Sequence, residues 1–308
     1  MSKSVLLILL VAAAAFVLSG CSVTRSVRYA NSEQYSVGEA KITDSIEVIE
    51  IDWPSGDVRL DPHGGNAVLL SENAKRELPE ELRVHWWVEG AILRVKYAAP
   101  GASLMGIDTG HKELTLSVPE DLALKEVAIR STSAKIHTAG LTAETLDIST
   151  ASGSMDIDCT AQKISLNSTS GHIKLTERDK TDEIGASTVS GKIHVELGRA
   201  DKVDLESTSG KIGVTAASVD SLAARSTSGG VACELAVVPS DCTLHTVSGK
   251  VELLLPDGSD FTAKVRTASG DFASDFPLQR DGDLYVCGSG RADMDIETTS
   301  GNISVRRK

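Results

Sequence analysis

Apolar and polar residues alternate with a period of two through most of the chain after residue 126, and this alternation recurs at a near-constant interval. Each recurrence is centred on a glycine, and the eight glycines are Gly153, Gly171, Gly191, Gly210, Gly229, Gly249, Gly270 and Gly301. Their spacings are 18, 20, 19, 19, 20, 21 and 31 residues. A near-fixed period of this length is typical of a solenoid, in which each repeat stacks on its neighbours.

The apolar positions change phase at each of these glycines. Before the glycine they stand seven and five residues back, as Leu146 and Ile148 do, and a Ser or Thr stands three residues back. After the glycine they stand two and four residues on, as Met155 and Ile157 do. A continuous strand cannot change the parity of its buried face, so we expect a bend at each Ser-Gly step. Glycine suits a bend because it reaches positive φ without a steric penalty.

These patterns predict an all-β fold, a parallel β-solenoid with coils of about 19–20 residues. We expect the inward Ser/Thr residues to form a ladder of hydroxyl groups at the bends. Residues 41–125 depart from the repeat and hold all three tryptophans, and Glu89-Gly90 between two apolar runs indicates a hairpin turn. One domain over 41–308 is therefore expected, with an N-terminal cap and first coil over 41–125, antiparallel elaborations in that cap, and repeat coils over 126–308. The last strand runs into Arg306–Lys308, and a charged tail at that end would discourage stacking of further chains.

The N-terminus carries a pattern of another kind. Lys3 precedes an uncharged apolar run from Val5 to Leu18, which is too short to span a bilayer and fits a signal peptide. The sequence LSGC, ending at Cys21, resembles the lipobox of bacterial lipoproteins. The resemblance implies cleavage before Cys21, lipidation of that cysteine and attachment to a membrane. A signal peptide over 1–20 and a lipidated tether over 21–40 follow; an ordinary secretory signal is the alternative.

Composition and charge narrow the function classes. The formal net charge is −12, which argues against a nucleic-acid binder because such proteins need a basic surface. Aromatic residues make up 4% of the chain, and none lies between Glu126 and Asp260. The repeats therefore offer no ring on which a sugar or a base could stack.

Candidate chemistry is sparse, and we expect no metal and no cofactor. Cys233 and Cys242 occupy inward columns, where they could form a disulfide or serve as small apolar core groups. A mildly basic stripe on the post-glycine face could meet an anionic glycan or a lipid headgroup, or simply discourage aggregation. Its members are His172, Lys174, Lys192, His194 and Lys211. Polysaccharide-active β-helix enzymes need clustered carboxylates in a groove, whereas outward residues here change from coil to coil, so we predict no catalytic residue.

The lipobox, the early copy of the bend at Ser55-Gly56, the Leu114–Pro119 strand and the Ser-Gly repeats together resemble one bacterial family. Its members are provisionally named adhesins, and their function is unknown. The resemblance covers residues 41–308 and implies an envelope-associated parallel β-solenoid without catalytic residues. It implies a non-enzymatic protein anchored to the cell envelope, at the outer membrane in a Gram-negative cell, that presents an interaction surface to an envelope protein or glycan. A regulatory or scaffold lipoprotein of envelope-stress systems is the alternative, and a polysaccharide-active enzyme is a weaker one.

Overall fold

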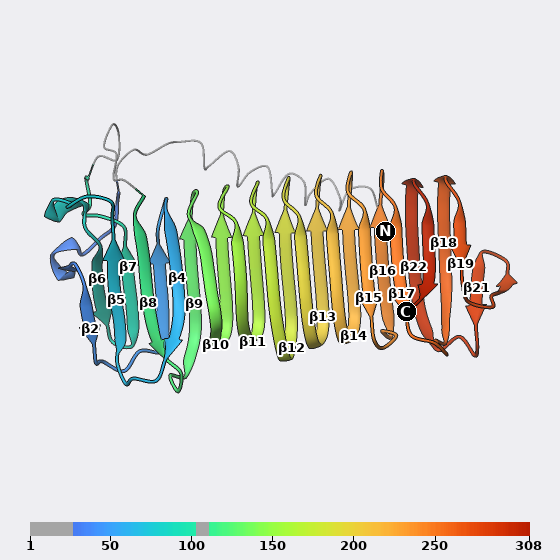
Figure 1. Ribbon diagram of the computed structural model, residues 1–308, viewed down its shortest axis with the longest axis horizontal. Coiled ribbons are helices and arrows are strands. Elements are labelled where there is room, and N and C mark those ends of the chain that lie inside the picture. The colour runs from blue at the N-terminus through green and yellow to red at the C-terminus, as the bar shows by residue number, and fades with distance from the viewer. Residues whose placement is uncertain (1–26, 103–110) are drawn as a thin grey trace.

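The computed structural model describes residues 27–102 and 111–308. Strands stack side by side along the long axis of a rod and run across that axis (Figure 1). Two three-residue 3-10 helices are the helical elements of the described part, so the all-β prediction with a largely parallel sheet is confirmed. Within these residues, no helix has the length and apolar character needed to cross a membrane.

The elements before the central coils are η1 (Ser32–Gln34), β1 (Ser36–Val37), β2 (Ala40–Ile42), β3 (Val48–Asp52), β4 (Asp57–His63), β5 (Val68–Asn73), η2 (Glu80–Leu82), β6 (His85–Glu89), β7 (Ile92–Lys96), β8 (Glu113–Pro119) and β9 (Leu124–Ser131). The central coils contain β10 (Lys135–Thr150), β11 (Met155–Ser168), β12 (Ile173–Thr188), β13 (Ile193–Ser207) and β14 (Ile212–Ser226). The remaining strands are β15 (Val231–Leu235), β16 (Asp241–Thr246), β17 (Val251–Leu255), β18 (Phe261–Ser269), β19 (Phe272–Ser274), β20 (Gln279–Asp281), β21 (Leu284–Cys287), β22 (Ala292–Ser300) and β23 (Ile303–Arg307).

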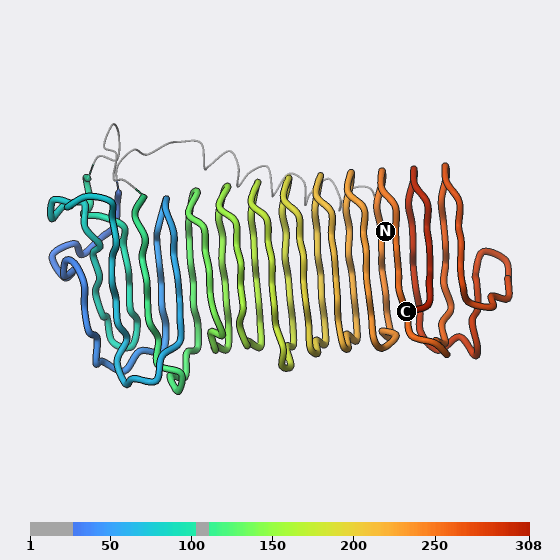
Figure 2. Tube along the Cα trace, viewed as in Figure 1, coloured from blue at the N-terminus to red at the C-terminus, as the bar shows by residue number. Residues whose placement is uncertain are grey.

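Each central coil is a flattened loop with two straight arms, which Figure 2 traces from one coil to the next. In β11, the arm that follows the glycine runs from Met155 to Cys159, and a register shift before Lys163 marks the corner where the chain turns back. The second arm ends at Ser168, where the next Ser-Gly step begins. We call the layer of first arms the post-glycine sheet and the layer of second arms the pre-glycine sheet. Paired residues in neighbouring coils are 18 to 20 positions apart.

The core lies between the two sheets and consists of the apolar columns that the alternation predicts. Leu146 and Ile148 in the pre-glycine sheet and Met155 and Ile157 in the post-glycine sheet are at most 1% exposed. Burying one such side chain contributes about 1.5–3 kcal/mol. The core is only one layer of side chains thick on each sheet, so aliphatic residues fill it, and the largest buried ring, Trp53, lies in the cap.

Glycine is needed at the bends for a different reason from the one expected. Of the eight bend glycines only Gly270 has a positive φ, so the conformational argument is wrong for the other seven. At all eight, an added Cβ would lie 1.6–2.3 Å from a carbonyl oxygen of the adjacent coil. The closest case is Gly210, at 1.6 Å from the carbonyl oxygen of Gly191. The bends are thus a column of backbones in direct contact, which leaves no room for a side chain.

The inward Ser/Thr residues lie along this column, but in the described coils their hydroxyl groups bond to backbone groups of the bends and form no ladder among themselves. The Ser207 hydroxyl accepts a hydrogen bond from the N–H of Gly210 at 2.8 Å and donates one to the carbonyl of Gly191 at 3.3 Å. Ser226 repeats the arrangement with Gly229 and Gly210 at 2.9 and 3.1 Å. Each hydroxyl therefore satisfies two buried backbone groups at a bend where ladder hydrogen bonds are interrupted.

The N-terminal end of the rod departs from sequence order. β3 lies between β7 and β9, and β4 lies between β8 and β10. Along the chain, the second level of the rod (β3 and β4) therefore comes first, the outermost level (β7 and β8) comes next, and the third level begins with β9. β5 pairs antiparallel with β8, and β6 pairs antiparallel with β7 through the expected turn at Glu89-Gly90. β1 then pairs with β6, and β2 pairs with β5. A free tether reaching residue 40 is not what the structure shows, because Val27 already bonds to the backbone of Gly101 and Ala102 and β1 pairs with β6.

A matching exchange occurs at the C-terminal end. β22 and β23 insert between β16–β17 and β18–β19, so the last coil of the chain is the penultimate level of the rod. The long spacing before Gly301 holds the β20–β21 hairpin, which pairs antiparallel with β18 at the end of the rod. The expectation that the charged C-terminal residues lie at the open end of the rod is therefore wrong. Lys308 instead pairs with Glu234 at 2.7 Å beside an inner level.

Candidate functional site

The five residues of the expected basic stripe lie together on the outer surface of the post-glycine sheet, and all are exposed. Lys174 in β12 and His194 in β13 are direct register partners. The backbone N–H of Lys192 donates to Nδ1 of His172 at 3.0 Å, and Lys211 occupies the same position one coil further on. The stripe predicted from sequence order is therefore a contiguous surface in this part of the rod.

Acidic neighbours neutralise one row of this stripe and leave the other cationic. Lys174 lies 3.4 Å from Asp156, and the ring of His194 lies 3.1 Å from Glu196. Lys192 and Lys211 form no ion pair with any described residue. The uncompensated positive charge is thus concentrated beside the bend column.

The two inward cysteines do not form the disulfide considered above. Cys233 and Cys242 face the core from opposite sheets of one coil, and both are buried free thiols. Burial raises the pKa of Cys233 to about 12, so this thiol stays protonated and unreactive at neutral pH. Buried free thiols agree with the alternative of small apolar core groups. Cys21, the predicted lipidation site, lies outside the described residues.

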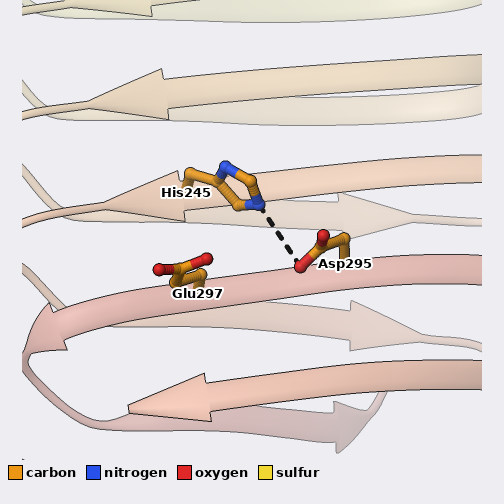
Figure 3. Close-up of side chains that lie close together, drawn as sticks. All are labelled: His245, Asp295 and Glu297. Carbon is orange, nitrogen blue, oxygen red and sulfur yellow. Dashed lines mark ion pairs between the residues drawn. The ribbon is translucent and has the colours of Figure 1, made fainter. Parts of the chain in front are cut away.

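Sequence order gave no sign of the group formed by His245, Asp295 and Glu297 (Figure 3). One potential ligand atom from each lies within 4.8 Å of the other two, because β22 is inserted beside β16. Arg266 of β18, however, donates to Asp295 at 3.1 Å and also to Glu297. The guanidinium already pairs with both carboxylates, and a metal ion would have to displace it. We therefore assign the group as a surface ion-pair network.

A second unexpected feature is a buried charge in the N-terminal cap. Lys112 is 1% exposed, and its Nζ lies 2.6 Å from Glu72 and 4.0 and 4.7 Å from the ring centroids of Tyr97 and Trp53. Burial lowers the pKa of Lys112 to about 8, and the Glu72 carboxylate opposes that shift. The aromatic residues of the cap thus enclose an ion pair that fixes the first level of the rod, and the group is closed to ligands.

The third unexpected feature is a shallow depression of about 770 Å³ on the outer surface of the pre-glycine sheet, over β9 to β13. Gly185 lies at its floor, and its polar lining includes five carboxylates and two lysines. Sequence reasoning missed it because the outward polar residues there are ordinary when each is taken alone. The signal that was available is an outward glycine in the middle of a strand.

The architecture and the bend column can be compared with known proteins. The model of the Toastrack DUF4097 family matches residues 46–306. This chain belongs to that family. The match covers the rod from β3 to β23, and the family resemblance inferred from the Ser-Gly repeats is confirmed. The Toastrack DUF4097 domain is one of unknown function, so membership brings no active-site residues with it.

Solved structures show the same architecture. Two chains described as a "putative adhesin", from Parabacteroides merdae and Parabacteroides distasonis, each align with 89% of this chain at a TM-score of 0.51. The alignments cover 96% and 97% of those chains at 16% and 15% identity. A "putative lipid binding protein" from Parabacteroides distasonis aligns at a TM-score of 0.48 and 16% identity over 89% of this chain and 97% of its own. At these identities the likeness to the two chains described as adhesins shows the fold alone. No curated protein matches this sequence.

Proposed function

We propose that this Toastrack protein is a non-enzymatic, lipid-anchored rod of the cell envelope that binds an anionic glycan through its basic stripe. The observation that carries the proposal is the pair Lys192 and Lys211, which are exposed and uncompensated among the described residues. They project from successive coils of a rigid sheet, about 4.8 Å apart. A polymer with repeated negative charges can meet both at once.

Anchoring through Cys21 would hold the N-terminal cap close to the membrane. Val27 already contacts the cap, where its carbonyl accepts a hydrogen bond from Gly101 at 2.8 Å. The six residue-to-residue steps from Cys21 to Val27 can span at most about 20 Å. The rod contains eleven parallel levels in the described part, so its β20–β21 end would stand about 50 Å further out.

Ion pairing on the outer surfaces favours binding over catalysis. Arg266 pairs with Asp295 and Glu297, and Arg225 lies 3.0 Å from Asp204. Each of these carboxylates already accepts a charge-assisted hydrogen bond from a guanidinium, so none of them stands beside a second free carboxylate as glycoside cleavage requires. These carboxylates therefore support a binding surface in preference to a polysaccharide-cleaving site.

Substitution of one stripe lysine tests this proposal. On a column of immobilised polyuronate at low salt, the wild-type protein should be retained and elute as salt screens the charges. Lys192→Glu should pass through, because it reverses the uncompensated charge. Lys250→Glu is the matched control, since Lys250 occupies the same position two coils on from Lys211 but already pairs with Glu252 at 2.8 Å. No retention of the wild type, or equal loss in both variants, would contradict the proposal.

A further inference from the structure

Gly185 lies in the middle of the pre-glycine arm of β12, where the fold has no need of a glycine. Its φ is not positive. A Cβ added there would meet no atom nearer than the carbonyl oxygen of Ile164, at an ordinary 4.0 Å. The bend glycines differ sharply, since a Cβ on Gly210 would lie only 1.6 Å from an oxygen atom. Glycine weakens a strand and often marks a place where a ligand approaches the backbone. The absence of a side chain at Gly185 is therefore explained by the outer surface of the sheet and not by packing inside the fold.

The missing side chain opens a floor of backbone and small groups. Gly185 is the register partner of Ser165 on one side and of Asp204 on the other. Asp147 pairs with Ser165 from the strand beyond. Two carboxylates therefore face each other across three strand spacings, about 14 Å, with only a hydroxymethyl group and a glycine between them. This gap can accept a pyranose ring lying flat on the sheet.

Hydrogen-bond donors and acceptors surround this floor at close spacing. Ser187 donates to Oδ1 of Asn167 at 2.7 Å, and Nδ2 of Asn167 donates to Ser165 at 3.1 Å. The second amide hydrogen of Asn167 remains free for a ligand. Asp147 and Lys163 form no ion pair with any described residue. The depression thus offers an unpaired acceptor and an unpaired donor on the same surface.

We propose that this depression, the Gly185 site, binds a neutral saccharide. Sugar hydroxyls donate to Asp147 and Asp204 and accept hydrogen bonds from Lys163 and Asn167, and the ring lies against the backbone at Gly185. Hydroxyl groups match this surface because each is both a donor and an acceptor. The inference goes beyond the function proposed for the basic stripe, which lies on the opposite sheet and binds an anionic glycan.

Other ligand classes fit the Gly185 site less well. Five carboxylates against two lysines give the lining a formal charge of −3, which repels anionic polymers. The apolar residues that border it, such as Ile164 and Ile184, point into the core and are at most 3% exposed, so a lipid chain finds no apolar wall. An extended peptide needs a free sheet edge, whereas β12 is paired on both sides. Since no aromatic ring lines the site, we expect a dissociation constant in the millimolar range, about 4 kcal/mol of binding free energy.

Filling the site separates this role from a purely structural one. Gly185→Thr places a strand-favouring side chain in the open depression, so the melting temperature should stay the same or rise. Binding of neutral gluco-, manno- and galacto-oligosaccharides, followed by chemical-shift changes in a protein NMR titration, should weaken at least tenfold. Ala223→Thr is the matched control, because Ala223 holds the same outward position in the coil beyond Asp204 and does not line the depression. Asp147→Asn should also weaken binding without changing the fold.

The outcomes distinguish this site from the stripe. The inference is overturned if the wild-type protein shows no shift with any neutral oligosaccharide at about 20 mM, well above the expected dissociation constant. It is also overturned if Gly185→Thr binds as tightly as the wild type. Binding confined to a uronic-acid oligosaccharide, abolished by Lys192→Glu and untouched by Gly185→Thr, would place the glycan site on the stripe alone.

Discussion

At the scale of single residues, the bend glycine and the hydroxyl residue three positions before it act as one unit. The change of parity at the bend interrupts the sheet ladder, so the glycine N–H and a neighbouring carbonyl need other partners. One Ser or Thr hydroxyl satisfies both, as Thr188 does with Gly191 and Gly171 at 3.0 and 3.3 Å. Glycine allows the coils to approach closely enough for this hydroxyl to reach across.

Gly210→Ala should therefore destabilise the protein by about 2–4 kcal/mol, because the new Cβ forces two bends apart and breaks hydroxyl–backbone hydrogen bonds. Equilibrium urea unfolding measures the change. Gly185→Ala is the matched control: it makes the same substitution where the Cβ is free of close contact, and it should raise stability by about 0.5–1 kcal/mol. An unchanged midpoint for Gly210→Ala would contradict the close-approach explanation.

At the scale of secondary-structure elements, the ends of the rod are closed by strands taken out of sequence order. The hydroxyl-to-backbone hydrogen bonds follow the spatial order, since Thr298 donates to the carbonyl of Gly249 at 2.9 Å and Thr267 to that of Gly301 at 3.1 Å. An exposed coil end invites pairing with other chains, and the β20–β21 hairpin covers part of the last strand. The long connection before β22 lets the chain reach outward, form this cover and return.

Deletion of residues 292–308, which removes β22 and β23, should unfold more than the final coil. Without this level, β18 and β19 lose the strands on which they stack, so hydrogen-exchange protection should disappear from residues 261–287. Protection in β10 to β14 should remain. Lys308→Ala is the control, because it removes only an exposed ion pair worth at most about 1 kcal/mol. Retained protection at 261–269 in the deletion variant would instead indicate coils stacked in sequence order.

At the scale of the whole molecule, the rod has two broad faces of different character, and the predicted lipid anchor would lie at its N-terminal end. The basic stripe and the Gly185 site lie over the same coils but on opposite sheets. A protein held by its N-terminal cap would expose both faces along its length. The chain carries a formal net charge of −12, so the cationic stripe is a local exception to the overall charge.

Cys21→Ser should move the protein from the membrane fraction to the soluble fraction, because stable attachment depends on the acyl chains. Fractionation and incorporation of labelled palmitate measure the change. The neighbouring Ser22→Ala should leave both anchoring and labelling intact. A Cys21→Ser protein that stays with the membrane, or a wild-type protein without label, would mean that the N-terminal segment is an ordinary secretory signal.

Much of the local architecture was predictable because it depends on side-chain periodicity alone. Alternation identified the inward columns, such as Leu146 and Ile148, and the parity change located the bends. The basic stripe followed from the same reasoning, because β11 to β14 stack in sequence order. The reason for glycine at the bends was not predictable, since a close approach between backbones exists only once two coils are stacked.

By itself, the sequence determined the period, the buried face of the repeat strands and the family, because these follow from the order of residue types along the chain. Tertiary structure alone decided which coils are neighbours at the two ends. Coils with the same motif are interchangeable in sequence, so only pairing can place β22 beside β16 and bring His245 to Asp295. The tertiary structure also distinguishes Gly185 from the rest of the 26 glycines, because the depression above it depends on the residues of adjacent strands.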